Sequence, residues 1–493
     1  MLKKTILIGF FVYLTLYVVF LFLNLHLIPI AWIDEIMGLD PSFRLFNGQG
    51  FNSYIWPQEG AEDFFMSYLP LQQWLHYLHL QVLPFDIYWI RFPWVIYLVL
   101  GSIILLYLFR KQGFTMLFAL FLVILLVNDK SIFETTRAVR IEPLIFLLIG
   151  LGVSAQHKGQ HLLLCIIATA LLFAHPNVWP MALVFYLQAI YTTYGVSKFS
   201  IKTIMCGFAP IIGLLLFSVF IDFRYADFAS QFLHQGADHA VNGNILHRLH
   251  SHFITRFWPY YTTQPWGPFI VYGALVHAII HLRKQGENTY FAYGIVLTHL
   301  VWLVILGPFA RYNGILLLLS VLYIAKPAYT YIQQRNARKM GVIILLIAII
   351  STANVVGRHT MALAQRAERN PYPVINWLKQ ELPQGDTTYL ITGSAISYYA
   401  MAPNSSAGYF LENIPPYKYD FDKYEQHLLL LDYPLEECEQ MVTYEVKQSK
   451  WSALFKSRTY SHLYLQRSKN AQSYAAILKK LDNESRAEVQ SRK

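Results

Sequence analysis

Long apolar runs constrain the fold of this chain more than any other feature of its sequence. About eleven such runs lie at residues 5–27, 87–109, 114–128, 141–155, 162–175, 178–194, 203–221, 268–282, 289–307, 313–327 and 341–357. A helix of roughly 20 apolar residues crosses a bilayer, and most of these runs approach or reach that length. Only 14% of the 493 residues are charged, well below the share in a soluble protein. The sequence therefore predicts a mostly α-helical, polytopic membrane bundle of about 11 transmembrane helices.

The charged residues divide the chain into two parts near Gln365. About a tenth of residues 1–365 are charged, against about a quarter of residues 366–493, which is the usual share of a soluble domain. In the second part, a helix-like segment at 373–381 precedes a strand-like segment at 387–391. We expect residues 1–365 to form a transmembrane module and residues 366–493 to form a small soluble α/β domain.

Lysine and arginine in the short connections predict the orientation of the bundle. If the N-terminus is cytoplasmic, the same side receives Lys3, Lys4, Arg110, Lys111, Lys158, Lys198, Lys202, Arg283, Lys284, Lys326, Arg335, Arg338 and Lys339. Positive charge of this kind marks cytoplasmic loops. We therefore expect a cytoplasmic N-terminus and an extracytoplasmic C-terminus. The excess positive charge belongs to the membrane part, which argues against nucleic-acid binding.

Two long outer connections, at residues 28–86 and 222–267, offer most of the room for chemistry. The first carries Asp34 and Glu35 directly after the first helix. Carboxylates at a membrane boundary are costly to dehydrate, so they either face a cavity or remain hydrated at the interface. Glu142 begins the fourth predicted helix on the same side. The helix dipole favours an acid at that position, and Arg137 or Arg140 can also pair with it.

Arginine dominates the cations predicted on the outer side before the tail. These cations are Arg44, Arg91, Lys130, Arg137, Arg140, Arg224, Arg248, Arg256, Arg311 and Arg358. Arginine makes planar, bidentate contacts with phosphate oxygens. The set therefore indicates contact with phosphate, either in a substrate or in the head groups of ordinary lipids.

Five histidines occur in the second outer connection, followed by several aromatic residues. The histidines are His234, His239, His247, His250 and His252. The spacing of His247 and His250 would place both on one helical face, as in some metal sites. No acids lie at a ligand-like spacing, so we favour an amphipathic helix on the membrane surface and expect no metal or other cofactor in the site. A divalent metal remains the alternative.

Read together, these motifs resemble the GT-C superfamily of glycosyltransferases. The resemblance is to the branch that contains the protein O-mannosyltransferases and the lipid A aminoarabinose transferases (glycosyltransferase family 39-like), and it covers roughly residues 1–330. The matching stretches are Asp34-Glu35, Tyr68-Leu69-Pro70-Leu71, Trp89-Ile90-Arg91-Phe92-Pro93, Arg140-Ile141-Glu142-Pro143-Leu144 and Ala310-Arg311-Tyr312. The family often has a Lys-Gly-Pro-like step at the outer start of the sixth helix, where this chain has His175-Pro176-Asn177.

The resemblance implies transfer of a hexose or pentose from a polyprenyl-phosphate donor to a lipid, glycan or protein acceptor. It assigns Asp34 as the base that deprotonates the acceptor, with Glu35 in support and Glu142 holding acceptor or sugar hydroxyls. Its candidates for the lipid phosphate are Arg311 first, then Arg140 and Arg256. Its candidates for other substrate contacts are Tyr68, His175 and Tyr312. The expected reaction is a single displacement that inverts the sugar on the extracytoplasmic face.

Two other functions fit parts of the sequence. Many helices with cations near the membrane also occur in transporters and lipid flippases, although we find no internal repeat of the kind that such proteins commonly show. A non-catalytic assembly partner is the third alternative. No sugar-binding repeat domain interrupts the membrane helices, which favours a multi-pass protein of a bacterial inner membrane over a eukaryotic O-mannosyltransferase.

Overall fold

The computed structural model describes residues 2–53, 55, 63–198, 200–239, 244–261, 263–282, 289–305, 312–334, 337–382, 388–392, 395–401, 409–411, 426–431, 435, 438–446 and 459–468. The chain forms two compact units. The membrane unit comprises Met1–Leu23, Met66–Trp74 and Phe92–Arg358. The sheet unit comprises Asn24–Phe65, Leu75–Arg91 and His359–Lys493. Unlike the sequence-based division at residue 365, this one gives parts of the first outer connection to the same unit as the tail.

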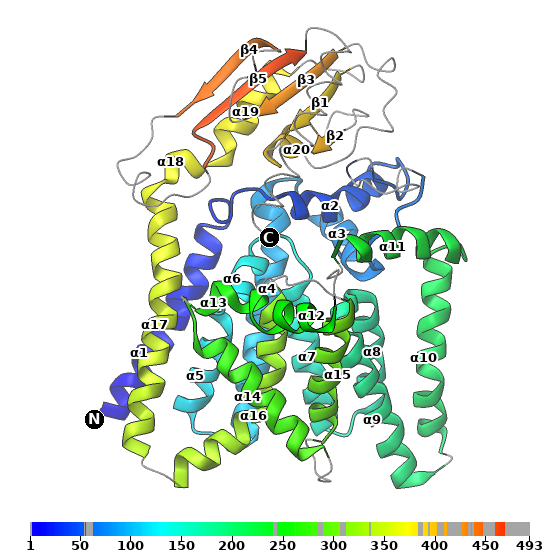
Figure 1. Cartoon of the computed structure of the whole chain (residues 1–493), viewed down its shortest axis with the longest axis vertical. Coiled ribbons are helices and arrows are strands. Elements are labelled where there is room, and N and C mark those ends of the chain that lie inside the picture. The colour runs from blue at the N-terminus through cyan, green and yellow to red at the C-terminus, as the bar shows by residue number, and fades with distance from the viewer. Residues whose placement is uncertain are drawn as a thin grey trace. The chain divides into compact units, whose positions relative to one another are not determined.

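The membrane unit is built from helices (Figure 1). Its longer helices are α1 (Leu2–Leu23), α4 (Ile87–Lys111), α5 (Met116–Val127), α7 (Glu142–His157), α8 (His161–Ala174), α9 (Trp179–Ser197), α10 (Ile201–Phe220), α11 (Tyr225–His239), α14 (Trp266–His281), α15 (Thr289–Ile305), α16 (Asn313–Gln334) and α17 (Ala337–Ala364). Its shorter elements are α6 (Lys130–Thr136), η1 (Pro176–Val178), α12 (Ile245–Phe253), η2 (Thr255–Phe257) and α13 (Trp258–Tyr261), with α3 (Pro70–Val82) beginning in this unit. The ends of α3, α4 and α17 fall in the sheet unit.

Each predicted apolar run coincides with a helix over most of its described length, but not every helix is long enough to span a bilayer. Within the described residues, five helices meet that standard by length and composition: Lys4–Leu23, Ile87–Lys111, Ile201–Phe220, Asn313–Gln334 and Ile344–Ala364. The bent pair α5 and α6 adds a sixth if it is one broken span. Shorter apolar helices occur at Glu142–His157, His161–Ala174, Trp266–His281 and Tyr290–Leu303. The structure thus supports a multi-pass membrane fold, and the number of eleven spans stays a prediction.

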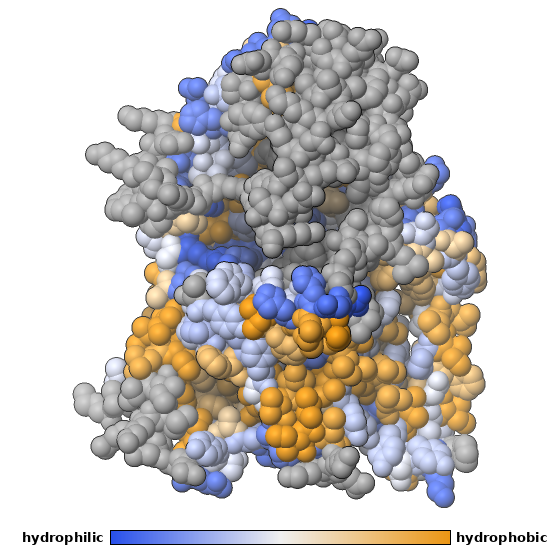
Figure 2. Space-filling model, viewed as in Figure 1, coloured by the Kyte–Doolittle hydropathy of each residue, from blue (hydrophilic) through white to orange (hydrophobic). Residues whose placement is uncertain are grey.

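The outward faces of these helices are apolar, as a lipid-facing surface requires. On α10, for example, Phe208 is 55% exposed and Leu214 is 63% exposed. Figure 2 shows hydrophobic surface over the helices of this unit, with a hydrophilic strip at the position of α12. Figure 1 shows α11 and α12 running across the direction of α10 and α15.

A bend of 65° separates α5 from α6, and polar groups satisfy the backbone there. Asp129 caps α6, because its Oδ1 accepts hydrogen bonds from the backbone N–H groups of Ser131 at 2.9 Å and Ile132 at 3.1 Å. Gln264 accepts from the backbone N–H of Lys130 at 2.9 Å and donates to the carbonyl oxygen of Asn128 at 2.6 Å. These hydrogen bonds satisfy backbone groups that the break leaves without partners inside a helix.

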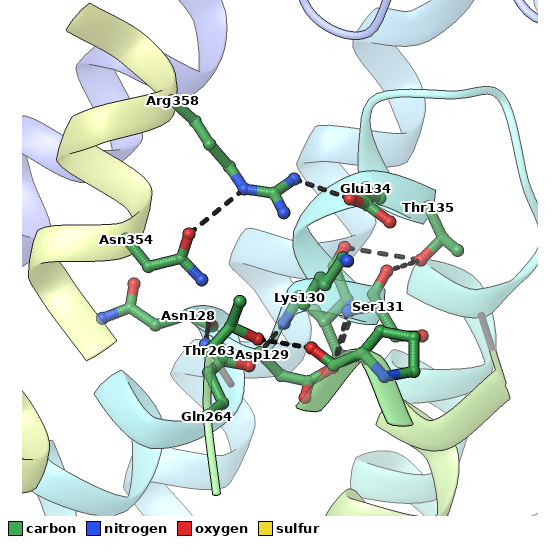
Figure 3. A network of polar contacts seen from close by, with 12 residues as sticks. Asn128, Asp129, Lys130, Ser131, Glu134, Thr135, Thr263, Gln264, Asn354 and Arg358 are labelled. Carbon is green, nitrogen blue, oxygen red and sulfur yellow. Dashed lines mark hydrogen bonds and ion pairs between the residues drawn. The ribbon is translucent and has the colours of Figure 1, made fainter. Parts of the chain in front are cut away.

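The same region is tied to α17 by an ion pair. Figure 3 shows the Arg358 guanidinium between Glu134 of α6 and Asn354 of α17. Nη1 of Arg358 lies 2.6 Å from Oε1 of Glu134. Both side chains are partly exposed, so the pair orients the two helices more than it stabilises them.

The sheet unit contains a five-stranded mixed sheet of order β2-β1-β3-β5-β4. Its strands are β1 (Thr388–Thr392), β2 (Tyr409–Leu411), β3 (Gln426–Leu431), β4 (Cys438–Glu445) and β5 (His462–Ser468). β1 pairs in parallel with β2 and β3, whereas β5 pairs antiparallel with β3 and β4. The four leucines at 428–431 are buried, as expected for a central strand covered on both faces.

Four helices complete this unit. They are α2 (Ile33–Phe46), α18 (Arg366–Arg369), α19 (Pro371–Glu381) and α20 (Ile396–Met401). The ring of Trp377 on α19 lies 5.3 Å from that of Tyr444 on β4, so α19 packs on the sheet. Both α19 and β1 begin within two residues of the expected helix and strand, and the small α/β character of the tail is confirmed.

Candidate functional site

Glu35, in the first turn of α2, is fully buried in an ion pair with Arg91 of α4. Nη2 of Arg91 lies 2.7 Å from Oε2 of Glu35, and Nε lies 3.2 Å from both carboxylate oxygens. The Tyr399 hydroxyl of α20 donates to Oε1 of the same carboxylate. Burial raises the pKa of Tyr399 well above its usual value, so this phenol keeps its proton. Glu35 therefore holds α2, α4 and α20 together.

The remaining hydrogen bonds of Arg91 fix the chain just after the first membrane helix. Its Nη1 donates to the carbonyl oxygens of Leu25 and Pro29, each at 2.9 Å. The backbone N–H of Ala31 in turn donates to the Tyr460 hydroxyl at 2.7 Å. These contacts determine where α2 begins, and so where its first-turn acids lie.

Asp34 differs from its neighbour in exposure. Its side chain is half-buried, whereas Glu35 is fully enclosed. A carboxylate must be reachable by the group that it deprotonates. Of the two adjacent acids, Asp34 is the one whose exposure suits a base.

Glu142 and Arg140, in the membrane unit, form a second buried pair. Nη2 of Arg140 lies 2.8 Å from Oε1 of Glu142, and Nε lies 3.0 Å from the same oxygen. Arg137 is directed elsewhere, because its Nη1 donates to the carbonyl oxygen of Leu21 at the end of α1 at 3.2 Å. Of the two arginines that the sequence offered to Glu142, the structure pairs it with Arg140.

The backbone immediately before Arg140 is strained. Val139 has φ of 53°, in the left-handed region that a β-branched residue rarely adopts. Nε2 of Gln72 on α3 donates to the Val139 carbonyl oxygen at 3.2 Å and supports this conformation. Such strain costs about 1–3 kcal/mol and is commonly found at functional sites. Here it sets the direction in which the chain presents Arg140.

Aromatic rings connect Arg140 to His175. Cζ of Arg140 lies 5.6 Å from the ring centroid of Tyr312, and the His175 ring lies 5.1 Å from the same ring. His175 caps η1, since its Nδ1 accepts a hydrogen bond from the backbone N–H of Asn177 at 3.2 Å. The neutral ring therefore carries its hydrogen on Nε2.

Arg256, in η2, is fully buried. Its Cζ lies 4.7 Å from the ring centroid of Trp302 on α15, and Trp302 lies 6.2 Å from Tyr312. Asn313 donates to the Arg256 carbonyl oxygen at 3.1 Å, and Trp302 donates to the carbonyl oxygen of Asn177 at 3.0 Å. Burial lowers the pKa of Arg256 to about 9, so the guanidinium remains charged at neutral pH.

These contacts bring together residues that are far apart in the sequence. We call Arg140, Glu142, His175, Arg256, Trp302 and Tyr312 the arginine–aromatic cluster. Five of its six members were candidates from sequence alone. Trp302 was missed, because a single tryptophan within an apolar run carries no signal of its own.

The other predicted site residues have different outcomes. Arg311 lies outside the described residues. Tyr68 is half-buried in the segment between two anchored points. On one side of Tyr68, the backbone N–H of Met66 donates to Oε1 of Gln231 at 2.8 Å. On the other side, Nε2 of Gln72 donates to the carbonyl oxygen of Val139, the residue before Arg140.

The histidines of the second outer connection do not assemble a metal site in the part of the chain that the structure describes. There, no group of three or more His, Cys, Asp or Glu side chains is placed to hold a metal ion. His247 and His250 are exposed, whereas His252 is buried on the opposite side of α12. The exposed Leu246 and Trp258, 71% and 67% exposed, fit the amphipathic helix that the sequence favoured.

Comparison with known proteins identifies the fold. No family model and no curated protein matches the sequence. The crystal structure of ArnT from Cupriavidus metallidurans bound to undecaprenyl phosphate matches with a TM-score of 0.55 and 10% identity, covering 92% of this chain and 97% of that one. The chain shares the fold of this ArnT. The likeness that the sequence motifs predicted is thus confirmed as a likeness of fold.

Within this fold, the arginine–aromatic cluster combines two buried guanidinium groups with two aromatic rings. Two guanidinium groups converge on aromatic rings in a buried setting, where interactions with an anion are stronger than in water. Cation–π contacts hold each guanidinium in a fixed direction, so little further ordering is needed on binding. A phosphate is the anion that such planar donors recognise best.

Proposed function

We propose that this protein is a membrane glycosyltransferase that moves a sugar from a polyprenyl-phosphate donor to an acceptor outside the cytoplasm. One observation carries the proposal: two buried arginines, Arg140 and Arg256, meet around Tyr312 and Trp302 in a chain with the fold of ArnT. The ArnT crystal contains undecaprenyl phosphate, which is the kind of ligand that this cluster suits.

Because the leaving group is a phosphate, the cations of the site are the most important groups for the reaction. A sugar on a lipid phosphate already has a good leaving group, and the phosphate gains negative charge as the bond to the sugar breaks. Groups aimed at that developing charge lower the barrier. We assign this role to Arg256 and Arg140, and on sequence grounds to Arg311, which precedes Tyr312.

The acceptor requires a base. We assign it to Asp34, which takes the proton of the acceptor hydroxyl or amine while the acceptor attacks the anomeric carbon from the face opposite the phosphate. A single displacement of this kind inverts the sugar. Glu35, fully enclosed by Arg91 and Tyr399, supports Asp34 by fixing the first turn of α2.

The remaining candidates serve the sugar and the acceptor. Glu142 fixes the fork of Arg140 and retains carboxylate lone pairs for a sugar or acceptor hydroxyl. Nε2–H of neutral His175 is a donor for the same purpose. We assign Tyr68 and Tyr312 to the walls around the substrate.

The test is mass spectrometry of lipid, glycan and protein fractions from cells with and without the protein. In cells without the protein, the proposal predicts that a component of one fraction lacks the mass of a single sugar and that undecaprenyl-phosphate sugar accumulates. Complementation with Arg256→Ala should fail to restore the mass. Identical spectra from both cell types, with the protein expressed in one of them, would contradict the proposal.

A further inference from the structure

One side chain of α3 holds the backbone next to an arginine of the arginine–aromatic cluster. Gln72, in the first turn of α3, is only 8% exposed. Its Nε2 donates to the carbonyl oxygen of Val139 at 3.2 Å. That carbonyl belongs to the peptide group that joins Val139 to Arg140. The hydrogen bond therefore acts on the peptide group from which the Arg140 side chain starts.

Val139 has a conformation that its own side chain disfavours. Its φ of 53° lies in the left-handed region, where the branched side chain crowds the backbone. Glycine would adopt this conformation at no steric cost. Here the valine side chain is fully buried, so packing occupies the position and the backbone needs support from its neighbours. A hydrogen bond to the carbonyl oxygen gives that support, because it is lost if the peptide group turns.

The direction of this peptide group matters for the guanidinium of Arg140. Nη2 of Arg140 lies 2.8 Å from Oε1 of Glu142, and Cζ lies 5.6 Å from the ring centroid of Tyr312. Both contacts require the side chain to leave the backbone in one direction. A planar, bidentate donor recognises phosphate only when its fork is correctly aimed. A turn of the preceding peptide group would move that fork.

The start of α3 is itself anchored, so Gln72 has a fixed base. Oε1 of Gln231 on α11 accepts hydrogen bonds from the backbone N–H of Met66 at 2.8 Å and from Oγ of Ser67 at 3.1 Å. Gln231 is only 2% exposed, which protects these bonds from competition with water. The segment 66–72 is therefore held to α11 at one end and to Val139 at the other.

We propose that Gln72 is a positioning residue for the donor phosphate. Through the Val139 carbonyl oxygen, it keeps the guanidinium of Arg140 aimed at the phosphate, and it contacts neither the phosphate nor the sugar. This inference rests on the proposed function and deepens it. It gives the first outer connection a part in binding the phosphate, in addition to carrying the base Asp34.

A purely structural role for Gln72 makes a different prediction. If Gln72 only satisfies a buried carbonyl group, its loss weakens the fold and affects binding by the same factor whatever residue stands at position 140. If Gln72 positions Arg140, its loss has no effect on binding once Arg140 is gone. A double-mutant cycle separates the two roles, because it measures the coupling between two positions.

The test uses Gln72→Met in purified protein in lipid nanodiscs, alone and combined with Arg140→Ala or Val139→Gly. Methionine is similar in length to glutamine but cannot donate a hydrogen bond. Gln72→Asn, whose amide is one methylene group shorter, is measured in parallel. Gln188→Met is the control, because Gln188 on α9 is a buried glutamine of similar exposure, 7%, outside the cluster. Titration with labelled undecaprenyl phosphate gives the affinity, and thermal unfolding checks the fold.

We expect Gln72→Met and Gln72→Asn to bind undecaprenyl phosphate about tenfold more weakly than wild type, the scale of one buried hydrogen bond. Neither loss should exceed that of Arg140→Ala. In the Arg140→Ala background, Gln72→Met should cause no further loss. In the Val139→Gly background its effect should shrink to about twofold or less, because glycine holds the left-handed conformation without strain. Gln188→Met should bind like wild type.

Two results would overturn the inference alone. One is wild-type affinity in Gln72→Met when Arg140→Ala binds weakly. The other is a loss by the same factor in all three backgrounds, which would show that Gln72 does not act through Arg140. A different result tests the proposed function: if Arg140→Ala itself binds undecaprenyl phosphate like wild type, the phosphate role of Arg140 fails, and the inference fails with it.

Discussion

At the scale of single residues, burial separates acids and cations that look alike in the sequence. Glu35 and Asp34 are adjacent, yet one is enclosed by an arginine and a phenol while the other is half-buried. Arg137 and Arg140 are three positions apart, yet one bonds to carbonyl oxygens of α1 and the other joins the cluster. The residue types were predictable, but their partners depend on tertiary contacts that no spacing encodes.

The first prediction concerns Asp34. Asp34→Asn keeps the shape of the side chain but removes the charge that accepts the acceptor proton. Turnover should fall by about 100-fold to 10,000-fold, as for loss of a positioned base. Binding of undecaprenyl phosphate should change little. Single-turnover kinetics decide the point, and near-normal turnover in the Asn variant would move the role of base to Glu142.

The second prediction concerns Arg256. Arg256→Lys keeps the charge but loses the planar fork, and Arg256→Ala loses both. Affinity for undecaprenyl phosphate should be lower in Arg256→Lys than in wild type, and lower still in Arg256→Ala. Turnover should fall as well, because the phosphate gains charge in the transition state. Titration with labelled undecaprenyl phosphate measures the affinity.

Arg224→Ala is the matched control for Arg256. Arg224 is a partly exposed cation of the same predicted outer side, paired with Asp227 at 2.7 Å. Arg224→Ala should leave the affinity for undecaprenyl phosphate unchanged. Equal losses at both positions would indicate a general effect of charge rather than a phosphate site at Arg256.

At the scale of elements, the sequence predicted where the long helices lie, but it did not predict where a helix is interrupted. Periodicity and apolar content predicted α5 and α7, but the short α6 between them was missed, because Asn128 and Asp129 read as an ordinary connection. Asp129 instead caps a new helix, and Tyr260 and Gln264 satisfy the break from another part of the chain. An amphipathic α12 was expected, whereas the inward turn of His252 toward α15 depends on packing.

The third prediction concerns α2. Glu35→Gln leaves the fully buried Arg91 without its ionic partner, which should destabilise the protein by about 3–5 kcal/mol. Thermal unfolding of the purified protein in detergent measures the loss. A double variant, Glu35→Leu with Arg91→Met, should be more stable than either single one. If Glu35→Gln unfolds like wild type but loses turnover, Glu35 acts in the chemistry and the structural assignment is wrong.

At the scale of the whole molecule, the division of the chain was only partly predictable. Charge content separated the tail from the bundle, and the structure places α19 and β1 where the sequence put them. It also assigns residues 24–65 and 75–91 to the same unit as the tail. That assignment depends on buried polar contacts such as Tyr398 with Asp40, which join residues hundreds of positions apart.

The fourth prediction concerns orientation. In a variant without the three native cysteines, a cysteine at Gln49 or His250 should react with an impermeant reagent in intact spheroplasts. A cysteine at Gln160, between α7 and α8, should react only after the membrane is opened. All three positions are exposed, so access depends on the side of the membrane. If only the cysteine at position 160 reacts in intact spheroplasts, the topology is the opposite of the predicted one, and the proposed site lies on the cytoplasmic side.

The central claim is that this chain transfers a sugar from a polyprenyl phosphate, and release of undecaprenyl phosphate by the purified protein tests it most directly. The protein in nanodiscs is given undecaprenyl-phosphate hexoses and pentoses with a membrane extract as acceptor. We predict that wild type releases undecaprenyl phosphate from one of these donors and forms a product of inverted anomeric configuration, while Asp34→Asn and Arg256→Ala do not. Binding of every donor without release from any of them by wild type would contradict the account.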